Sequence, residues 1–161
     1  MVQFVLILCL ATVIALTIWA AISDLRYRII ANKIPIAICI AYAIYALTRY
    51  FILGTPFAVI GLELITGVVM LVAGFTLFAA NIMGGGDAKL IAALALFAGV
   101  HNLAAFLMLV ALSGGIVAIA TWAYARRQKD DATDASPEVP YGIAISVGGL
   151  WILGLNLSSV L

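Results

Sequence analysis

The chain has 161 residues, of which 66% are hydrophobic and 9% are charged, and its formal net charge is +1. Soluble domains carry about 25% charged residues and are about half apolar, so this composition excludes a soluble globular protein and indicates an integral membrane protein. A net charge this small provides no extended basic surface, so no nucleic acid is expected as a partner. We expect one domain, residues 1–161, embedded in the lipid bilayer.

Apolar runs long enough to cross a bilayer as helices, about 20 residues each, follow one another along the chain. In chain order, the first three are residues 2–23, 34–53 and 57–80. The run at 88–124 is too long for one span and breaks near residues 99–102, which divides it into a short fourth helix and a full fifth. After a polar segment of mixed charge at 126–139, expected to be a solvated loop, the sixth run begins at Pro140 and reaches the C-terminus. The sequence therefore predicts an all-α polytopic membrane protein with six transmembrane helices.

The distribution of lysine and arginine predicts the orientation of these helices. The loops on one side hold seven of the eight basic residues, and the other side holds only Arg49. Because basic residues concentrate in cytoplasmic loops, the side with seven is expected to be cytoplasmic. Six spans then place both termini outside, an N-out/C-out topology. The seven are Arg26, Arg28, Lys33, Lys89, Arg126, Arg127 and Lys129.

Two aspartates fall on the cytoplasmic face in this layout. Asp24 follows the first predicted helix, and Asp87 stands at the entry to the fourth, within the segment Asn-Ile-Met-Gly-Gly-Gly-Asp-Ala-Lys-Leu. The fourth helix has only about 13 residues, or roughly 20 Å, which is too short to cross the hydrocarbon core alone. We therefore expect Asp87 to lie below the headgroup level, inside the protein, at the same depth as Asp24.

Two such carboxyl groups are sufficient to hydrolyse a peptide bond. One, ionised, takes a proton from the attacking water, while the other, protonated, hydrogen-bonds the carbonyl oxygen; close carboxylates resist ionising together, which keeps the pair in this mixed state. Other chemistry has less support, because the chain lacks an HExxH motif and its two cysteines, Cys9 and Cys39, lie inside apolar runs. No metal ion and no other cofactor is expected.

The three glycines before Asp87 are candidates for substrate binding. Gly84, Gly85 and Gly86 allow positive φ and the close approach of another backbone, so a substrate strand could lie against them. A structural role is an alternative, in which the glycines form a flexible turn and Asp87 caps a helix. Asp24 could likewise be a loop carboxylate paired with Arg26 or Arg28.

Three segments together resemble the GxGD-type aspartic membrane peptidases that process type IV prepilins and archaeal preflagellins. Ser-Asp-Leu-Arg-Tyr-Arg-Ile-Ile-Ala-Asn, residues 23–32, is similar to the family's Asp-x-Arg stretch, although Ala31 replaces a common proline. Met-Gly-Gly-Gly-Asp-Ala-Lys-Leu, residues 83–90, is similar to its GxGD segment. Val-Pro-Tyr-Gly-Ile-Ala-Ile-Ser-Val-Gly-Gly, residues 139–149, is similar to the segment opening its last helix.

The resemblance implies the site residues. Asp24 and Asp87 match the two catalytic aspartates, and Gly84 and Gly86 match the motif glycines. Lys89 matches a family lysine and joins the three glycines as a candidate substrate-binding residue. The resemblance also implies a membrane-embedded aspartic endopeptidase in the cytoplasmic (inner) membrane, which removes the basic leader of a prepilin at the cytoplasmic boundary.

The segment between the first two helices refines this expectation. Many family members carry there a cysteine-containing segment linked to N-methylation of the cleaved pilin. Here the loop has about ten residues and no cysteine, so no N-methyltransferase activity is expected. The small size resembles the tight-adherence (Flp) pilus branch and the archaeal enzymes.

Two readings of other classes remain open. A small transporter or proton-conducting subunit would use Asp24, Glu63 and Asp87 as a charge relay along the membrane normal, because acids inside a membrane are functional by default. Glu63 could instead hydrogen-bond across helices or reach the interface. An assembly subunit without chemistry would pair the aspartates with Arg26, Arg28 or Lys89.

Overall fold

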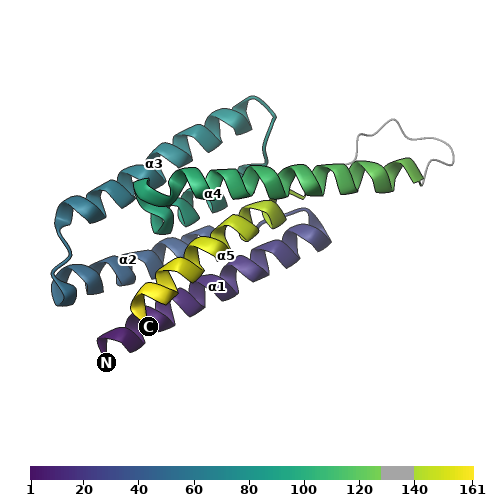
Figure 1. Ribbon diagram of the computed structural model, residues 1–161. Coiled ribbons are helices and arrows are strands. Elements are labelled where there is room, and N and C mark those ends of the chain that lie inside the picture. Colours follow the sequence, from purple (N-terminus) through teal and green to yellow (C-terminus); the bar gives the residue numbers. More distant parts are fainter. Residues whose placement is uncertain (128–139) are drawn as a thin grey trace.

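The computed structural model describes residues 1–127 and 140–161, in which all regular secondary structure is helical. The helices are α1 (Val2–Tyr27), α2 (Lys33–Leu53), α3 (Phe57–Ala79), α4 (Gly85–Arg127) and α5 (Tyr141–Val160) (Figure 1). Each of these five is long and apolar enough to cross a membrane. The chain is thus an all-α, multi-pass membrane protein, as predicted. Most of the polar segment at 126–139 lies outside the described residues.

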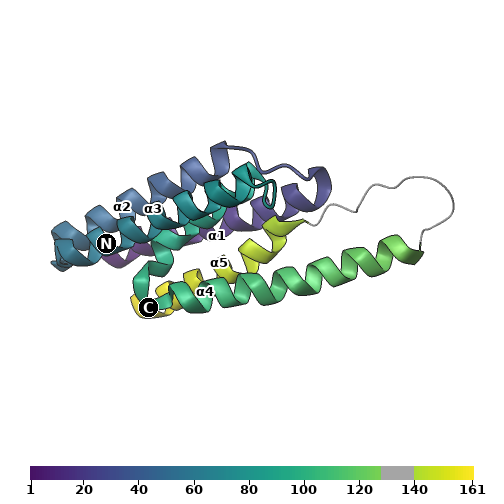
Figure 2. The same ribbon diagram turned by 90° about the horizontal axis from the view of Figure 1, so that it is seen from above.

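Helix α4 contains the break that the sequence predicted near residue 99. Gly99 has φ 57° and ψ −175°, a backbone conformation that is not helical and that favours glycine. Figure 2 shows the chain changing direction at this point, so that the two parts of α4 run differently through the protein. Gly99 therefore divides the long apolar run into a first part of α4, before the break, and a second part after it. Among the described residues, five helices are long and apolar enough to cross a membrane, and the predicted fourth and fifth helices are joined across the kink within α4.

Several helix ends differ from the predicted ones, and these differences bear on Asp24. Helix α1 continues past the predicted residue 23 to Tyr27, where Arg28 adopts a left-handed conformation and donates its N–H to the Asp24 carbonyl (2.9 Å). Asp24 therefore lies in the last turn of α1 rather than in a loop. Helix α2 begins at Lys33, so residues 28–32 make the whole connection, which is shorter than expected.

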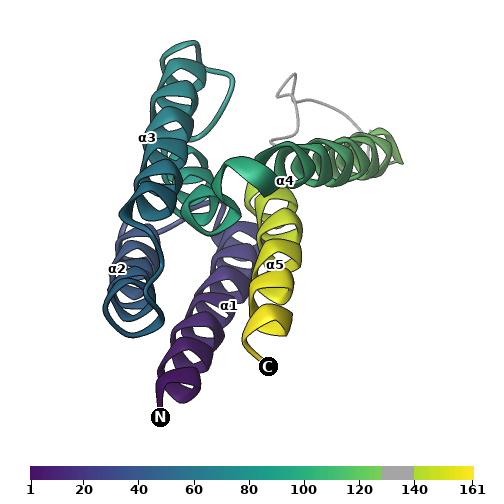
Figure 3. The same cartoon turned by 60° about the vertical axis from the view of Figure 1, so that its left-hand side comes forward.

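The first part of α4 is the centre of the bundle. Residues 88–99 are buried, apart from the half-buried Lys89. Helix α3 packs on α4, α4 packs on α5, and α5 in turn lies against α1. Figure 3 shows these neighbours around the first part of α4, and Figure 1 shows both termini at one end of the bundle. The backbones of α2 and α3, although consecutive, hardly approach each other.

A polar cluster joins the helices near the kink. Arg49 of α2 forms an ion pair with Glu63 of α3 (Nη1–Oε1 2.8 Å), and the Tyr42 hydroxyl donates to Glu63 Oε2 (2.8 Å). From α5, the Asn156 amide donates to the carbonyl of Phe97 (3.0 Å), two residues before the kink. Because a broken helix leaves carbonyls without their usual donors, this bond compensates part of the cost of the kink.

Candidate active site

Asp24 lies where the end of α1 meets the start of α5. Its side chain is buried, and its Oδ2 accepts a hydrogen bond from the backbone N–H of Gly142 (2.8 Å). Gly142 is the second residue of α5, and N–H groups in a first helical turn have no intrahelical partner. Asp24 thus caps the N-terminus of a helix that begins more than 100 residues later in the chain. The charge of Arg28, one turn further along, also acts on this carboxyl group.

Gly142 must be glycine for this contact to form. A Cβ at this position would lie 2.8 Å from both the Cβ and Oδ2 of Asp24, and 2.9 Å from its Cγ. One turn further into α5, the Ser146 hydroxyl donates to the Gly142 carbonyl (2.7 Å) and lies 3.1 Å from the carbonyl of Thr17 in α1. The start of α5 is therefore held against α1 at the contact with Asp24 and again one turn further along.

Asp87 occupies the equivalent place at the N-terminus of α4. Gly84 precedes the helix, and its carbonyl accepts the first helical hydrogen bond, from Ala88 N–H (3.1 Å). The carboxylate of Asp87, the third helical residue, reaches back to the N–H of Gly84, as the third residue does in a capping box. Asp87 Oδ1 is buried and has no hydrogen-bond partner among the residues that the structure describes. The oxygen that caps the helix is therefore Oδ2.

The two aspartates lie at the same end of the bundle, close enough for the charge of Asp24 to act on Asp87. Gly86 lets the start of α4 approach the connection between α1 and α2, because a Cβ there would lie 3.0 Å from the Cβ of Ile30 and 3.2 Å from its carbonyl oxygen. Lys89 makes a second connection, since its Nζ donates to Asn32 Oδ1 (2.8 Å). Three segments far apart in the sequence, at 23–32, 83–90 and 140–149, thus meet around two carboxyl groups.

A comparison with protein families matches residues 6–119, more than two thirds of the chain, to the type IV leader peptidase family. The chain belongs to the type IV leader peptidase family. It is an aspartic endopeptidase of the prepilin peptidase type, and the family implies prepilin-like substrates. Comparisons with curated proteins and with solved structures give no significant match.

Of the two properties predicted for the glycines of the peptidase's GxGD segment, the structure shows one. Positive φ was one expected reason for them, but among the described glycines only Gly54 and Gly99 have it. Close approach is the reason that the structure supports. Gly84 leaves space for the carboxylate of Asp87, Gly85 for the ring of Phe78, and Gly86 for the backbone of Ile30.

Lys89 and Glu63, the other polar candidates, lie in different places. The Lys89 ammonium bonds the amide oxygen of Asn32 rather than either aspartate. Glu63 is paired with Arg49 and Tyr42 in the cluster near the kink. It lies 16 positions before the end of α3, so about 24 Å of helix separates it from the end that leads to Asp87.

Sequence reasoning missed Gly142 and Asn32 as members of the site. Both stand in segments that carried the family resemblance, and this was the available signal. Their contacts with Asp24 and Lys89 are tertiary, at sequence separations of 118 and 57 residues. The described residues contain no group of three His, Cys, Asp or Glu side chains that could hold a metal ion.

Proposed function

We propose that the peptidase cleaves the basic leader from type IV prepilin-like substrates at the cytoplasmic boundary of the inner membrane, with Asp24 and Asp87 as its catalytic residues. The observation that carries this proposal is the position of the two aspartates. Each carboxylate caps a helix N-terminus through one oxygen, and the two face the same end of the bundle. Asp87 Oδ1 is buried and has no hydrogen-bond partner among the described residues, so it retains the capacity to accept a hydrogen bond from a reacting group.

Hydrolysis then needs only water and the two carboxyl groups. The ionised carboxylate removes a proton from water as the water oxygen bonds to the scissile carbonyl carbon, and the protonated partner donates its proton to the carbonyl oxygen. The intermediate collapses when the C–N bond breaks. The amide nitrogen then takes the proton that the first carboxylate had removed, and the hydroxyl proton returns to the second. The products are the carboxyl end of the leader and the amine of the mature pilin.

The position of the site supports the cytoplasmic boundary as the place of cleavage. If the parts of α4 before and after Gly99 count as separate spans, six spans bring both termini to one side, and Figure 1 shows the termini at one end. The aspartates then share a side with seven of the eight basic residues. Because that side is the cytoplasmic one, the aspartates would meet a substrate where its basic leader joins its apolar helix.

The short connection between α1 and α2 supports a peptidase without methyltransferase activity. Only residues 28–32 join the two helices, and none of them is cysteine. The described chain thus offers no domain there for a methyl donor. The length of this connection also favours the tight-adherence or archaeal branch of the family.

The charge-relay alternative has less support. A relay needs Glu63 to exchange protons with the aspartates, but its carboxylate is held by an arginine and a tyrosine, and about 24 Å of helix separates it from the aspartate end. An assembly subunit without chemistry loses one of its expected contacts, because Lys89 bonds Asn32 rather than an aspartate, although the charge of Arg28 does act on Asp24.

The test is co-expression with a candidate prepilin, followed by a gel assay of processing. Asp24→Asn and Asp87→Asn should each abolish cleavage while the protein remains inserted, because each removes one member of the pair. Glu63→Gln is the matched control: it neutralises an acid of the same membrane protein, outside the site, and the protein that remains folded and inserted should cleave at the unsubstituted rate. Partial activity in both aspartate variants would contradict the mechanism.

A further inference from the structure

A groove of about 690 Å³ opens between α2, α3 and the first part of α4. It exists because the backbones of α2 and α3 hardly approach each other, and the space between them ends on side chains of α4 that are themselves buried. Its walls are apolar, and several of the residues on its rim, such as Ile36, Leu64 and Val68, are well exposed. In a membrane protein, a groove of this kind faces the hydrocarbon core.

We infer that this groove binds the apolar transmembrane helix of the substrate, and holds it so that the cleaved segment reaches Asp24 and Asp87. The inference rests on the proposed function, which requires a substrate with such a helix. It assigns to the groove a role that the aspartates cannot perform, because two carboxyl groups do not bind an apolar segment.

The floor and wall of the groove fit a helix. Small residues from all three helices line it, among them Ala43 of α2, Gly67 of α3 and Ala92 of α4. In membranes, helices associate where small residues let their backbones approach closely, since lipid gives no hydrophobic driving force. Of these three, Ala43 is exposed and offers such a surface to a packed helix, whereas Gly67 and Ala92 are buried where α3 packs on α4, and Gly67 makes room for Leu96.

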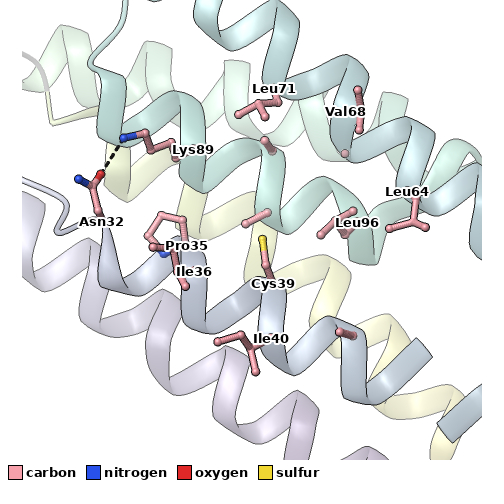
Figure 4. A pocket seen from close by; sticks show the side chains of 14 residues that line it. Asn32, Pro35, Ile36, Cys39, Ile40, Leu64, Val68, Leu71, Lys89 and Leu96 are labelled. Atoms are coloured by element: carbon pink, nitrogen blue, oxygen red, sulfur yellow. Dashed lines mark hydrogen bonds between the residues drawn. The ribbon is translucent and has the colours of Figure 1, made fainter. Parts of the chain in front are cut away.

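The polar end of the groove connects it to the candidate active site. Figure 4 shows Lys89 and Asn32 joined at one end, with Leu64 toward the other. Lys89 follows Asp87 by two residues, so the two side chains leave α4 on nearly opposite faces of one turn. The groove therefore ends one helix width away from the aspartates, at the same end of the bundle.

This geometry predicts where the substrate is cut. A helix is about 10 Å across, so about three extended residues at roughly 3.3 Å each would pass from the groove, across the N-terminal end of α4, to the aspartates. Gly84 immediately precedes α4, and Gly85 and Gly86 are the first two residues of its first turn. The scissile bond would thus lie about three residues before the start of the substrate's helix.

Cys39 gives a direct test, because its side chain is exposed and lines the groove (Figure 4), whereas Cys9 is buried. In the Cys9→Ala background, with Asp87→Asn to prevent cleavage, single cysteines are placed along the helix of a prepilin-like substrate and oxidised. Cys39 follows Asn32 by seven residues, or about 10 Å of helix. Cross-links are expected about ten residues after the cut, recurring every three to four residues, and should disappear with Cys39→Ala.

Ala43→Trp gives a second test by filling the groove. This substitution is made in the active enzyme, which keeps both aspartates. We expect KM for the substrate to rise about tenfold while kcat stays nearly unchanged, because the aspartates are not altered. Ala73→Trp is the matched control, because Ala73 is an exposed alanine of α3 outside the groove. It should leave both constants unchanged.

The outcomes separate this inference from the proposed function. Cleavage by the unsubstituted enzyme without any Cys39 cross-link, and with no rise in KM for Ala43→Trp, would overturn the groove as the docking site but not the peptidase. Loss of a co-purified lipid in Ala43→Trp at unchanged KM would identify the occupant as lipid and overturn it equally. No cleavage by the unsubstituted enzyme would overturn both.

Discussion

Replacing Gly142 by alanine should impair the peptidase through Asp24, although Gly142 has no side chain that could act in catalysis. The new Cβ would lie 2.8–2.9 Å from three atoms of the Asp24 side chain. Nonbonded carbons normally stay about 3.5–4.0 Å apart, so either α5 or the carboxylate must move by about 0.7 Å or more. Asp24 Oδ2 is bonded to the N–H of the same residue, so this movement also distorts the hydrogen bond.

The expected loss follows from that displacement. A misplacement of about 1 Å in catalytic geometry costs about 100-fold in rate, which corresponds to about 2.7 kcal/mol of transition-state stabilisation. The loss should fall on kcat, because in the proposed mechanism Asp24 acts on the reacting groups, and the apolar groove is unaffected. In an Asp24→Asn background the same substitution should add little, since residues that act as a unit are not additive.

The assay is cleavage of a purified prepilin-like substrate by purified enzyme in proteoliposomes, with kcat and KM measured separately. Gly154→Ala is the matched control, because it changes the same residue type in the same helix where a Cβ would meet nothing within 4 Å. It should retain full activity. Thermal unfolding of both variants shows whether any loss of activity is local. Full activity in folded Gly142→Ala, or an equal loss in Gly154→Ala, would refute the reasoning.

Further predictions concern the turn before α4, the polar cluster and the product. Gly86→Ala should lower kcat more than Gly85→Ala, because the first meets the backbone of Ile30 while the second meets a phenyl ring that can shift; equal effects would argue against a fixed contact. Glu63→Ala should destabilise the protein by about 3 kcal/mol in thermal unfolding, because it leaves a mostly buried arginine unpaired, and an unchanged melting temperature would contradict this. The mature pilin should have an unmodified N-terminal amine by mass spectrometry, and a methyl group added by this enzyme alone would show that the short loop does not exclude methyl transfer.

Apolar run lengths and glycine placement predicted much of the fold from sequence. The break near residue 99 was predictable because a run of that length exceeds one span, and Gly99 is the residue at which the helix breaks. The end of α1 was not predictable, because the predicted boundary was placed just before the first charged residue, Asp24. The actual end is set by the left-handed conformation of Arg28, which polarity does not reveal.

The contacts that complete the site were beyond the sequence for a physical reason. A glycine in an apolar helix is compatible with many roles. In α5, a Cβ added at Gly142 would clash with Asp24, whereas a Cβ added at Gly154 would meet open space. Only the packing of α5 on α1 distinguishes the two. The same applies to Asn32, whose amide belongs to the site only because the fold brings Lys89, at the start of α4, beside it.

Both aspartates accept a backbone N–H at a helix N-terminus. This interaction explains why the protein can keep two acids close together in a mostly apolar bundle. A carboxylate is costly to bury without partners, but a helix N-terminus supplies N–H donors that no other group satisfies. Asp24 takes one from α5 and Asp87 takes one from Gly84. Each bond occupies a single oxygen, so the carboxyl groups are held in place while retaining acceptor capacity. An unpaired buried oxygen such as Asp87 Oδ1 requires an explanation in a folded protein, and the binding of the attacking water in the proposed mechanism provides one.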